Sequence, residues 1–232
     1  VGKDITFAKL REKHDSIYIA TGTQLPNKID IPGENLKGVV HGLDFLRDFN
    51  LGYEVEIGDV VAVIGGGNTA IDAARAVLRM GAKKVMVLYR RTIEDMPADA
   101  REIHDAIEEG IEIIPLVAPV RFSGKDKVEE IECIKMKLGK FDSGGRRKPE
   151  VIEGSNFTIK VDMVIPAVSQ SSDLPFIKKD EVKMTEWGTF VTDKDTLMTT
   201  MEGVFAGGDV VRGSDVVITA IADGKKAATY ID

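Results

Sequence analysis

The sequence predicts an α/β protein whose central sheet is parallel. Residues 60–64 and 84–88 are short apolar runs rich in valine, which is typical of strands that are buried on both faces. Between these runs, Ile71, Ala74 and Leu78 recur at helical spacing, and Gly81 stands where a helix commonly ends. A strand, a helix and a second strand in this order form the unit from which parallel sheets are built.

The turn between the first strand and the helix carries small residues at three fixed positions. Gly65, Gly67 and Ala70 match the pattern G-x-G-x-x-G/A. The first glycine permits a tight turn, the second lets a phosphate approach backbone N–H groups, and the small third residue lets the helix pack close to its strand. The helix N-terminus adds partial positive charge. We therefore expect a Rossmann-like dinucleotide-binding domain whose phosphate turn consists of Gly65, Gly66, Gly67, Asn68, Thr69 and Ala70.

The end of the second strand decides which dinucleotide is preferred. In this fold an acidic residue there usually binds the ribose 2′-hydroxyl of NAD. Tyr89, Arg90 and Arg91 occupy the position instead. A guanidinium matches phosphate oxygens with a planar, permanent charge, whereas a carboxylate would repel a 2′-phosphate. We therefore expect NADP(H) rather than NAD(H). The alternative is that both arginines belong to a solvated strand end.

The remaining elements follow from periodicity and from turn residues. Residues 117–161 change to a period of two, which is typical of antiparallel strands. Further strands are expected at residues 16–20, 111–114, 161–168, 188–192 and 203–206. Further helices are expected at residues 7–14 and 43–49, from Pro97 to Gly110, and at about 215–230.

This order places the phosphate turn in the middle of the chain, so we expect one domain to interrupt another. The Rossmann-like NAD(P)-binding domain, a parallel sheet with an antiparallel β insert, is expected to cover residues 41–169. Residues 1–40 and 170–232 are expected to form segments of a second nucleotide-binding domain. That domain is expected to be incomplete, because its own first strand and glycine turn would precede Val1.

Four segments of the chain resemble a known family in order and spacing. They are IYIATG at 17–22, GGGNTAIDAAR at 65–75, YRRTIEDMPA at 89–98 and GVFAGGDVVRG at 203–213. Together they resemble the small (beta) subunit of NADPH-dependent glutamate synthase and related two-dinucleotide-binding flavoprotein oxidoreductases. The resemblance implies that NADPH passes hydride to FAD and that electrons leave through iron–sulfur clusters. It also implies a partner, either the glutamate synthase large subunit or another iron–sulfur electron-transfer protein.

The resemblance further implies which residues of the outer segments meet FAD. They lie in a turn beside the flavin, in the GGD turn whose acid hydrogen-bonds the ribityl chain, and at the start of a helix whose dipole faces the flavin. The matching residues are Thr21, Gly22, Gly208, Asp209, Val217 and Thr219. By itself, the GGD sequence would favour an ordinary turn residue at Asp209, but the flanking strand and helix favour the flavin role. Ser169 stands where the family normally has glycine, so backbone approach to the nicotinamide half is expected to differ.

Composition and scattered residues exclude several other activities. The net charge of −7 does not favour a nucleic-acid-binding surface, and we expect no membrane span and a cytoplasmic location. The single cysteine, Cys133, is expected in a buried strand, which removes any Cys-x-x-Cys pair. His14, His41 and His104 show no metal-ligand spacing, so no metal site is expected. Hydride transfer needs no protein nucleophile, so no catalytic side chain is expected.

Two expectations concern the chain in isolation. A non-catalytic nucleotide-binding or subunit-interaction module stays open as an alternative to the oxidoreductase. A methyltransferase with a glycine-rich turn would leave Arg90 and Arg91 unexplained. If core strands of the outer domain are missing, apolar surface near Ile17, Ile19 and Phe205 is expected to be exposed and to cause self-association.

Overall fold

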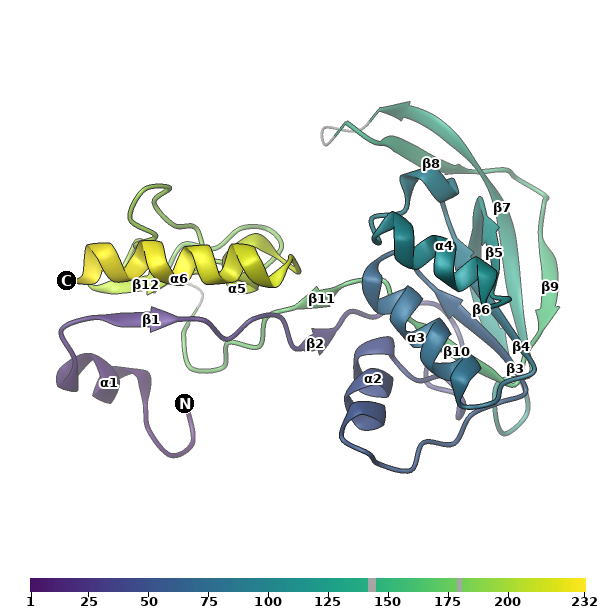
Figure 1. Cartoon of the computed structure of the whole chain (residues 1–232), viewed down its shortest axis with the longest axis horizontal. Coiled ribbons are helices and arrows are strands. Elements are labelled where there is room, and N and C mark those ends of the chain that lie inside the picture. The colour runs from purple at the N-terminus through teal and green to yellow at the C-terminus, as the bar shows by residue number, and fades with distance from the viewer. Residues whose placement is uncertain (142–144, 179–180) are drawn as a thin grey trace. The chain divides into compact units, whose positions relative to one another are not determined.

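The computed structural model describes residues 1–141, 145–178 and 181–232, which divide into two compact units. Unit 1 comprises Val1–Asn27 and Ser169–Asp232, and unit 2 comprises Lys28–Val168. The middle of the chain thus forms one unit and its two ends form the other (Figure 1).

Unit 2 is built on a four-stranded parallel sheet in the order β10-β3-β4-β5. The strands are β10 (Met163–Pro166), β3 (Val60–Ile64), β4 (Lys84–Tyr89) and β5 (Glu112–Pro115). The helices of this unit are α2 (Gly42–Asn50), α3 (Asn68–Arg79) and α4 (Ala100–Glu108), with a short 3-10 helix η1 (Ile93–Asp95). The predicted parallel sheet and its strand–helix–strand unit are confirmed. Pro97 does not open α4, because Asp99 caps the helix by accepting from the backbone N–H of Arg101.

The two faces of the parallel sheet bury alternate residues of each strand. Val61, Val63, Val85 and Val87 pack in one apolar cluster with side chains of α2, α3 and α4. Ala62, Ile64, Met86 and Leu88 pack in a second cluster against residues of the antiparallel strands. Both faces of the sheet are therefore covered, which explains why its strands read as continuous apolar runs.

The antiparallel layer consists of four strands within the range expected from the period of two. They are β6 (Val117–Ser123), β7 (Glu130–Phe141), β8 (Arg147–Val151) and β9 (Phe157–Lys160), and β7 pairs with each of the other three. Cys133 on β7 is fully buried, as expected, and burial raises the pKa of its thiol to about 12. A thiol so hard to ionise is a packing residue and a poor nucleophile.

Residues 28–40 belong to unit 2, although the sequence analysis grouped them with the N-terminal segment. Their backbone groups bond to unit 2: Phe122 N–H donates to the Pro32 carbonyl, and Val40 N–H donates to Val164. Glu34 closes the segment on itself, since its carboxylate accepts from the backbone N–H groups of Ile29 and Asp30. Residues 28–40 are held by backbone hydrogen bonds and form no regular helix or strand, so the sequence carries no periodic pattern that predicts their place in unit 2.

The described part of unit 1 contains two small sheets and three helices. Parallel strands β1 (Ile17–Ile19) and β12 (Val204–Ala206) form one sheet, and antiparallel β2 (Leu25–Pro26) and β11 (Gln170–Ser171) form the other. The helices are α1 (Phe7–Lys13), α5 (Asp209–Arg212) and α6 (Val217–Ile231). Residues 188–192 do not form the expected strand. They make only isolated bridges, because the chain turns at Gly188, whose φ is 76°.

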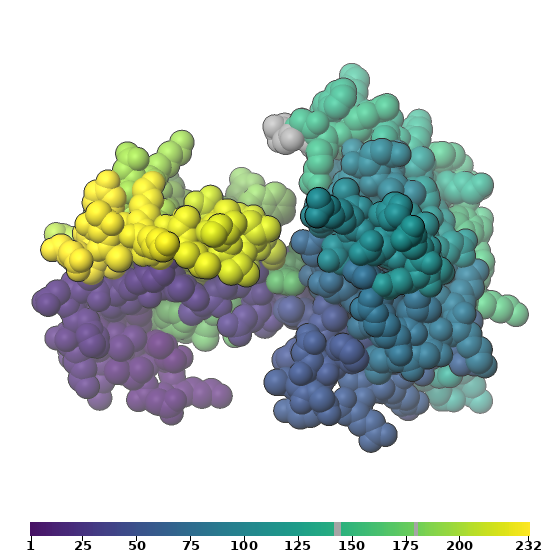
Figure 2. Space-filling model, viewed as in Figure 1, coloured from purple at the N-terminus to yellow at the C-terminus, as the bar shows by residue number. Residues whose placement is uncertain are grey.

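The apolar surface of unit 1 lies elsewhere than expected. Ile19 and Phe205 are buried, since β1 and β12 pair side by side and pack into the core of this unit. Other apolar residues of this unit are exposed instead: Trp187 is 84% exposed, and on α6 Val217 is 76% and Ile218 is 68% exposed. This helix, yellow in Figure 2, lies at the surface of unit 1. Among the described residues, no helix combines the length and apolarity needed to cross a membrane.

Candidate functional site

The three glycines between β3 and α3 have different surroundings. A Cβ on Gly65, whose φ is 147°, would lie 2.2 Å from the Ala167 carbonyl oxygen. A Cβ on Gly66 would lie 2.5 Å from Cε2 of Tyr89. A Cβ on Gly67 would meet no atom within 4 Å. Gly65 and Gly66 are therefore required by packing, whereas Gly67 faces open space, as a backbone that receives a ligand should.

The N-terminus of α3 presents unused backbone donors. Gly67 is the N-cap residue and its carbonyl accepts from the N–H groups of Ala70 and Ile71, but no side chain caps the helix. Within the described residues, nothing accepts a hydrogen bond from the backbone N–H of Gly67 or Asn68. Ala70 is fully buried beside Gly65, and Thr69 lies near Gly42 at the start of α2. The turn thus has the donors that a phosphate group requires.

A segment C-terminal to β4, residues 92–99, contacts this turn. Ala98 N–H donates to the Gly66 carbonyl at 3.1 Å, and Asp99 N–H donates to Oδ1 of Asn68 at 2.9 Å. The Tyr89 hydroxyl donates to the Asp95 carbonyl at 2.9 Å. The Tyr89 side chain is nearly buried against Gly66, so it supports the phosphate turn.

The two arginines at the end of β4 face different environments. Arg90 is exposed. Arg91 is only 6% exposed, and its Nε donates to the backbone carbonyl of Arg147 on β8 at 3.0 Å. The structure therefore presents Arg90 at the surface and anchors Arg91 in the antiparallel layer. The sequence pattern could not separate them, because both residues stand at a strand end and only the tertiary partner of Arg91 distinguishes them.

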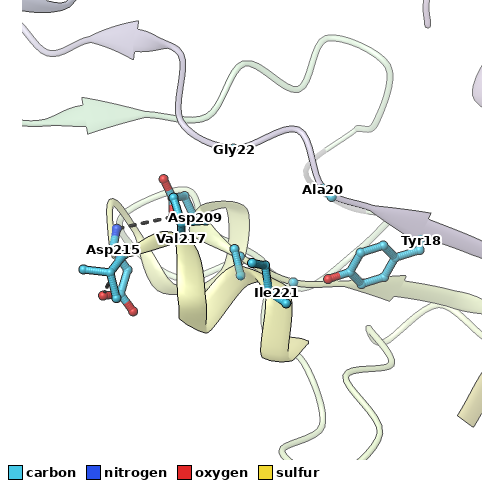
Figure 3. A pocket seen from close by; sticks show the side chains of 11 residues that line it. Tyr18, Ala20, Gly22, Asp209, Asp215, Val217 and Ile221 are labelled. Carbon is cyan, nitrogen blue, oxygen red and sulfur yellow. Dashed lines mark hydrogen bonds between the residues drawn. The ribbon is translucent and has the colours of Figure 1, made fainter. Parts of the chain in front are cut away.

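Unit 1 contains a cavity of about 400 Å³ beside the start of α6 (Figure 3). Four of the six residues expected to meet FAD line it, namely Gly22, Gly208, Asp209 and Val217. Two further lining residues, Gly207 and Val216, belong to the expected GGD turn and to the expected start of the helix. The lining residues that were not predicted are Tyr18, Ala20, Asp215, Ala220 and Ile221.

Thr21 and Thr219, the other two expected residues, do not line the cavity. The Thr21 hydroxyl is buried and has no hydrogen-bond partner among the described residues. The Thr219 hydroxyl bonds locally to the Asp215 carboxylate and the Val216 carbonyl, which holds the first turn of α6. Asp215 N–H also donates to Oδ1 of Asp209 at 3.3 Å, the contact drawn in Figure 3.

A buried carboxylate stabilises the glycine turn of this cavity. Asp223, in the middle of α6, is 2% exposed and accepts from Gly208 N–H at 2.9 Å and from two nitrogens of Arg212 at 2.8 and 2.6 Å. The hydrogen bond from Arg212, aided by that from Gly208, lowers the pKa of Asp223. Burial, with a contribution from Asp223, raises the pKa of Tyr18. Both groups therefore keep their usual charge at neutral pH.

Gly207 is needed because a Cβ there would lie 2.2 Å from the Tyr18 hydroxyl oxygen. The first glycine of GGD is thus explained by Tyr18, which lies on the neighbouring strand. Residues two apart share one face of a strand, so Tyr18 and Ala20 in IYIATG point to the same side. This alternation could have predicted that both residues line the cavity.

Two acidic clusters lie on α3 and α4. Asn68, Ile71, Asp72, Asp99 and Glu102 line a second cavity of about 270 Å³, and burial is the main cause that raises the pKa of Asp72. His104, Asp105 and Glu108 bring potential ligand atoms within 4.8 Å of one another on the exposed surface of α4. The sequence analysis overlooked this spacing. Exposed acidic groups of this kind are common without a bound ion, so we assign no metal site to them.

The fold defines a class of α/β protein in which one unit, with a glycine turn before its first helix, interrupts another. The chain belongs to the pyridine nucleotide-disulphide oxidoreductase family, which it matches over residues 3–224.

The chain is also similar to curated proteins along its whole length. It is 43% identical to the glutamate synthase [NADPH] small chain of Azospirillum brasilense, covering 100% of this chain and 51% of the relative. It is 41% identical to the NADP(+)-dependent formate dehydrogenase subunit beta of Moorella thermoacetica, covering 100% and 33%. The resemblance drawn from the sequence segments is therefore confirmed. The chain spans about half or less of the length of these relatives, both of which are named as subunits.

Solved structures agree on the fold. FprA from Mycobacterium tuberculosis, in complex with NADPH, superposes with a TM-score of 0.81 at 16% identity and covers 99% of this chain and 66% of that one. Thioredoxin reductase from T. acidophilum gives a TM-score of 0.70 at 24% identity, covering 93% and 64%. The predicted fold class, a parallel sheet with an antiparallel insert between outer segments, is confirmed.

Proposed function

We propose that this chain is the NADP(H)-binding part of a flavoprotein oxidoreductase in which NADPH passes hydride to FAD. The observation that carries the proposal is the phosphate turn: Gly67 is open, the start of α3 has no side-chain cap, and Arg90 is exposed at the end of the adjacent strand. The relatives support the choice of coenzyme, since the two compared above are named for NADPH or NADP(+).

Unit 2 would hold NADP(H) through charge and backbone donors. The N–H groups of Gly67 and Asn68 would bind the pyrophosphate, and the positive end of α3 would stabilise its charge. The exposed guanidinium of Arg90 would bind the 2′-phosphate, while Arg91 would hold the end of β4 against β8. Tyr89 would act through Gly66 as a positioning residue.

Unit 1 fits the flavin and ribityl end of FAD. Among the residues that the structure describes, the buried Thr21 hydroxyl has no hydrogen-bond partner and no side chain caps the start of α6. Asp209 borders the cavity. Asp209 would hydrogen-bond ribityl hydroxyls, and the start of α6 would stabilise negative charge on the flavin. FAD, when bound, would supply the chemistry of hydride acceptance and onward electron transfer. The chain would bind and orient the reactants and exclude water, with no catalytic side chain.

The onward electron acceptor would be a partner protein. Both compared relatives are named as subunits, one of glutamate synthase and one of formate dehydrogenase. We propose an iron–sulfur electron-transfer partner, of which the glutamate synthase large subunit is the candidate favoured by the higher identity. In that assembly the chain would serve glutamate biosynthesis.

Titration calorimetry of the chain with NADPH and with NADH tests the proposal. We expect tighter binding of NADPH, and we expect Arg90→Ala to weaken NADPH while leaving NADH unchanged, because only NADPH carries the 2′-phosphate. If the ratio of the NADPH and NADH affinities in Arg90→Ala equals that of the wild type, Arg90 does not bind the 2′-phosphate. Failure of the folded chain to bind either coenzyme would overturn the proposal.

A non-catalytic module is the second candidate function, and the exposure of α6 favours it for the chain alone. Val216 and Val217, which line the cavity, are exposed, so flavin bound there would stay open to solvent on that side. Visible absorbance of the purified chain distinguishes the two candidates. A yellow protein that NADPH bleaches favours the enzyme. A colourless protein that still binds NADPH favours the module.

A further inference from the structure

We propose that residues 92–99 orient the side-chain amide of Asn68, so that its NH2 group donates a hydrogen bond to the pyrophosphate of the coenzyme. This inference rests on the proposed NADP(H) site and extends it. It makes Asn68 a binding residue through its side chain and makes Asp99 a positioning residue through its backbone.

Two hydrogen-bond acceptors of the phosphate turn are already occupied. A carbonyl oxygen that faces a phosphate repels it. The Gly66 carbonyl accepts from Ala98 N–H, and Oδ1 of Asn68 accepts from Asp99 N–H. Successive N–H groups of one segment therefore occupy two acceptors of the turn, which leaves the donors of the turn for an anion.

The other half of the Asn68 amide is its NH2 group. An amide has its NH2 group on the opposite side from its oxygen, so fixing Oδ1 also fixes Nδ2. Across residues 1–141, 145–178 and 181–232, nothing accepts a hydrogen bond from Nδ2 of Asn68. Asn68 is exposed and is the first residue of α3. Its NH2 group is thus an oriented donor next to the unused backbone donors.

The orienting segment is held at several points along its length. Thr92 and Asp95 form a capping box at its start, with the Thr92 hydroxyl donating to Asp95 at 2.8 Å. Met96 and Ala98 are buried in the core of unit 2. At its end, the Asp99 carboxylate caps α4. A segment held at both ends and in the middle can fix an amide at little entropic cost on binding.

Two substitutions of Asp99 isolate the backbone donor. The φ of Asp99 is −57°, which suits proline, so Asp99→Pro removes the N–H without requiring a new φ. It also removes the cap of α4. Asp99→Ala removes the same cap but keeps the N–H, and is the matched control. Circular dichroism and thermal unfolding verify that both variants fold.

We expect Asp99→Pro to bind NADPH about 3- to 10-fold more weakly than Asp99→Ala, which is the range for one hydrogen bond. NADH should weaken by the same factor, because both coenzymes share the pyrophosphate. Equal affinities of the two variants would overturn the inference while leaving the proposed function intact. Absence of NADPH binding by the wild-type chain would overturn both.

A second variant decides the matter if Asp99→Pro does not fold. Asn68→Asp keeps an oxygen for Asp99 N–H but replaces the NH2 donor with a negative oxygen. We expect it to weaken NADPH and NADH alike, by about tenfold or more, in 0.5 M NaCl, where charges separated by more than a few Å are screened. Wild-type affinity in Asn68→Asp would overturn the inference. A direct check is the NMR signal of the Asn68 NH2 group, which should shift when NADPH is added.

Discussion

At the scale of single residues, the glycines of the phosphate turn separate packing from binding. Gly66→Ala would place a Cβ 2.5 Å from the buried Tyr89 ring. We expect it to lower the free energy of unfolding by about 1–3 kcal/mol, as overpacking does. Gly67→Ala meets no neighbour, and its φ of −88° suits alanine. It should change stability by less than about 0.5 kcal/mol.

Titration calorimetry with NADPH tests whether Gly67 lies at the binding site. In Gly67→Ala the new methyl group would stand where the phosphate approaches, so NADPH should bind more weakly to a fully stable protein. Unchanged affinity for NADPH would show that the open side of Gly67 is not the binding side.

Asp223 predicts how the stability of unit 1 depends on pH. Its folded pKa lies below the ordinary value, chiefly because of the hydrogen bond from Arg212. The ionised carboxylate therefore stabilises the fold above the unfolded pKa of about 4, and this contribution is lost as pH falls through the folded pKa. Asp223→Asn should cost about 1–3 kcal/mol at pH 7.

Urea unfolding of unit 1 at pH 7 and at pH 3 measures this effect. The difference between wild type and Asp223→Asn should shrink at pH 3, because this pH lies below the ordinary pKa of an aspartate and the unfolded chain there binds a proton that the folded chain resists. An undiminished difference would assign the loss to packing instead.

The sequence predicted residues whose role is local and missed those whose role is tertiary. Gly65, Gly67 and Ala70 follow a spacing that backbone geometry imposes within one turn, so their places were predictable. Asp223 was not, because an acid within an alanine-rich helix gives no sign that Arg212 and a glycine N–H surround it. The burial of Arg91 likewise depends on β8, which is distant in sequence.

At the scale of elements, a partly buried arginine joins α3 to α4. Arg75 pairs with Glu102, Asp105 and Glu109, and its side chain is 16% exposed. The pKa of Glu109 is lowered, chiefly by its hydrogen bond with Arg75. Arg75→Met should destabilise the protein more than the loss of an exposed ion pair does, by about 1–2 kcal/mol, because the partner carboxylates would repel one another without it.

Arg79→Met is the control for this element. Arg79 contacts Glu109 as well, but its side chain is 59% exposed, so its loss should cost no more than about 1 kcal/mol. Circular dichroism in urea measures both variants. Equal costs would mean that burial of Arg75 does not matter.

Periodic elements were predictable and irregular ones were not. The strands of the parallel sheet are buried on both faces, which leaves apolar runs in the sequence. Residues 188–192 contain similar β-forming side chains, but the surrounding chain offers only single bridges, so no strand forms. Residues 28–40 are joined to the rest of unit 2 by backbone hydrogen bonds. Such bonds can form with almost any side chains, so the sequence does not reveal them.

At the scale of the whole molecule, unit 2 is continuous in sequence whereas unit 1 is made of two segments. Unit 2 has apolar clusters on both faces of its sheet, and they contain no residue of unit 1. A fragment of residues 28–168 should therefore fold alone and bind NADPH with an affinity within a few-fold of that of the whole chain. Circular dichroism and calorimetry measure both properties.

The same division predicts the unfolding of the whole chain. Calorimetry should show two transitions, and NADPH should raise the midpoint of the one that the 28–168 fragment reproduces, since a ligand stabilises only the unit that binds it. Gly67→Ala in the whole chain is the control, because it should reduce the NADPH-induced shift without moving either midpoint in the absence of coenzyme. A fragment that folds but loses NADPH, while the whole chain keeps it, would mean that unit 1 supplies part of the coenzyme site.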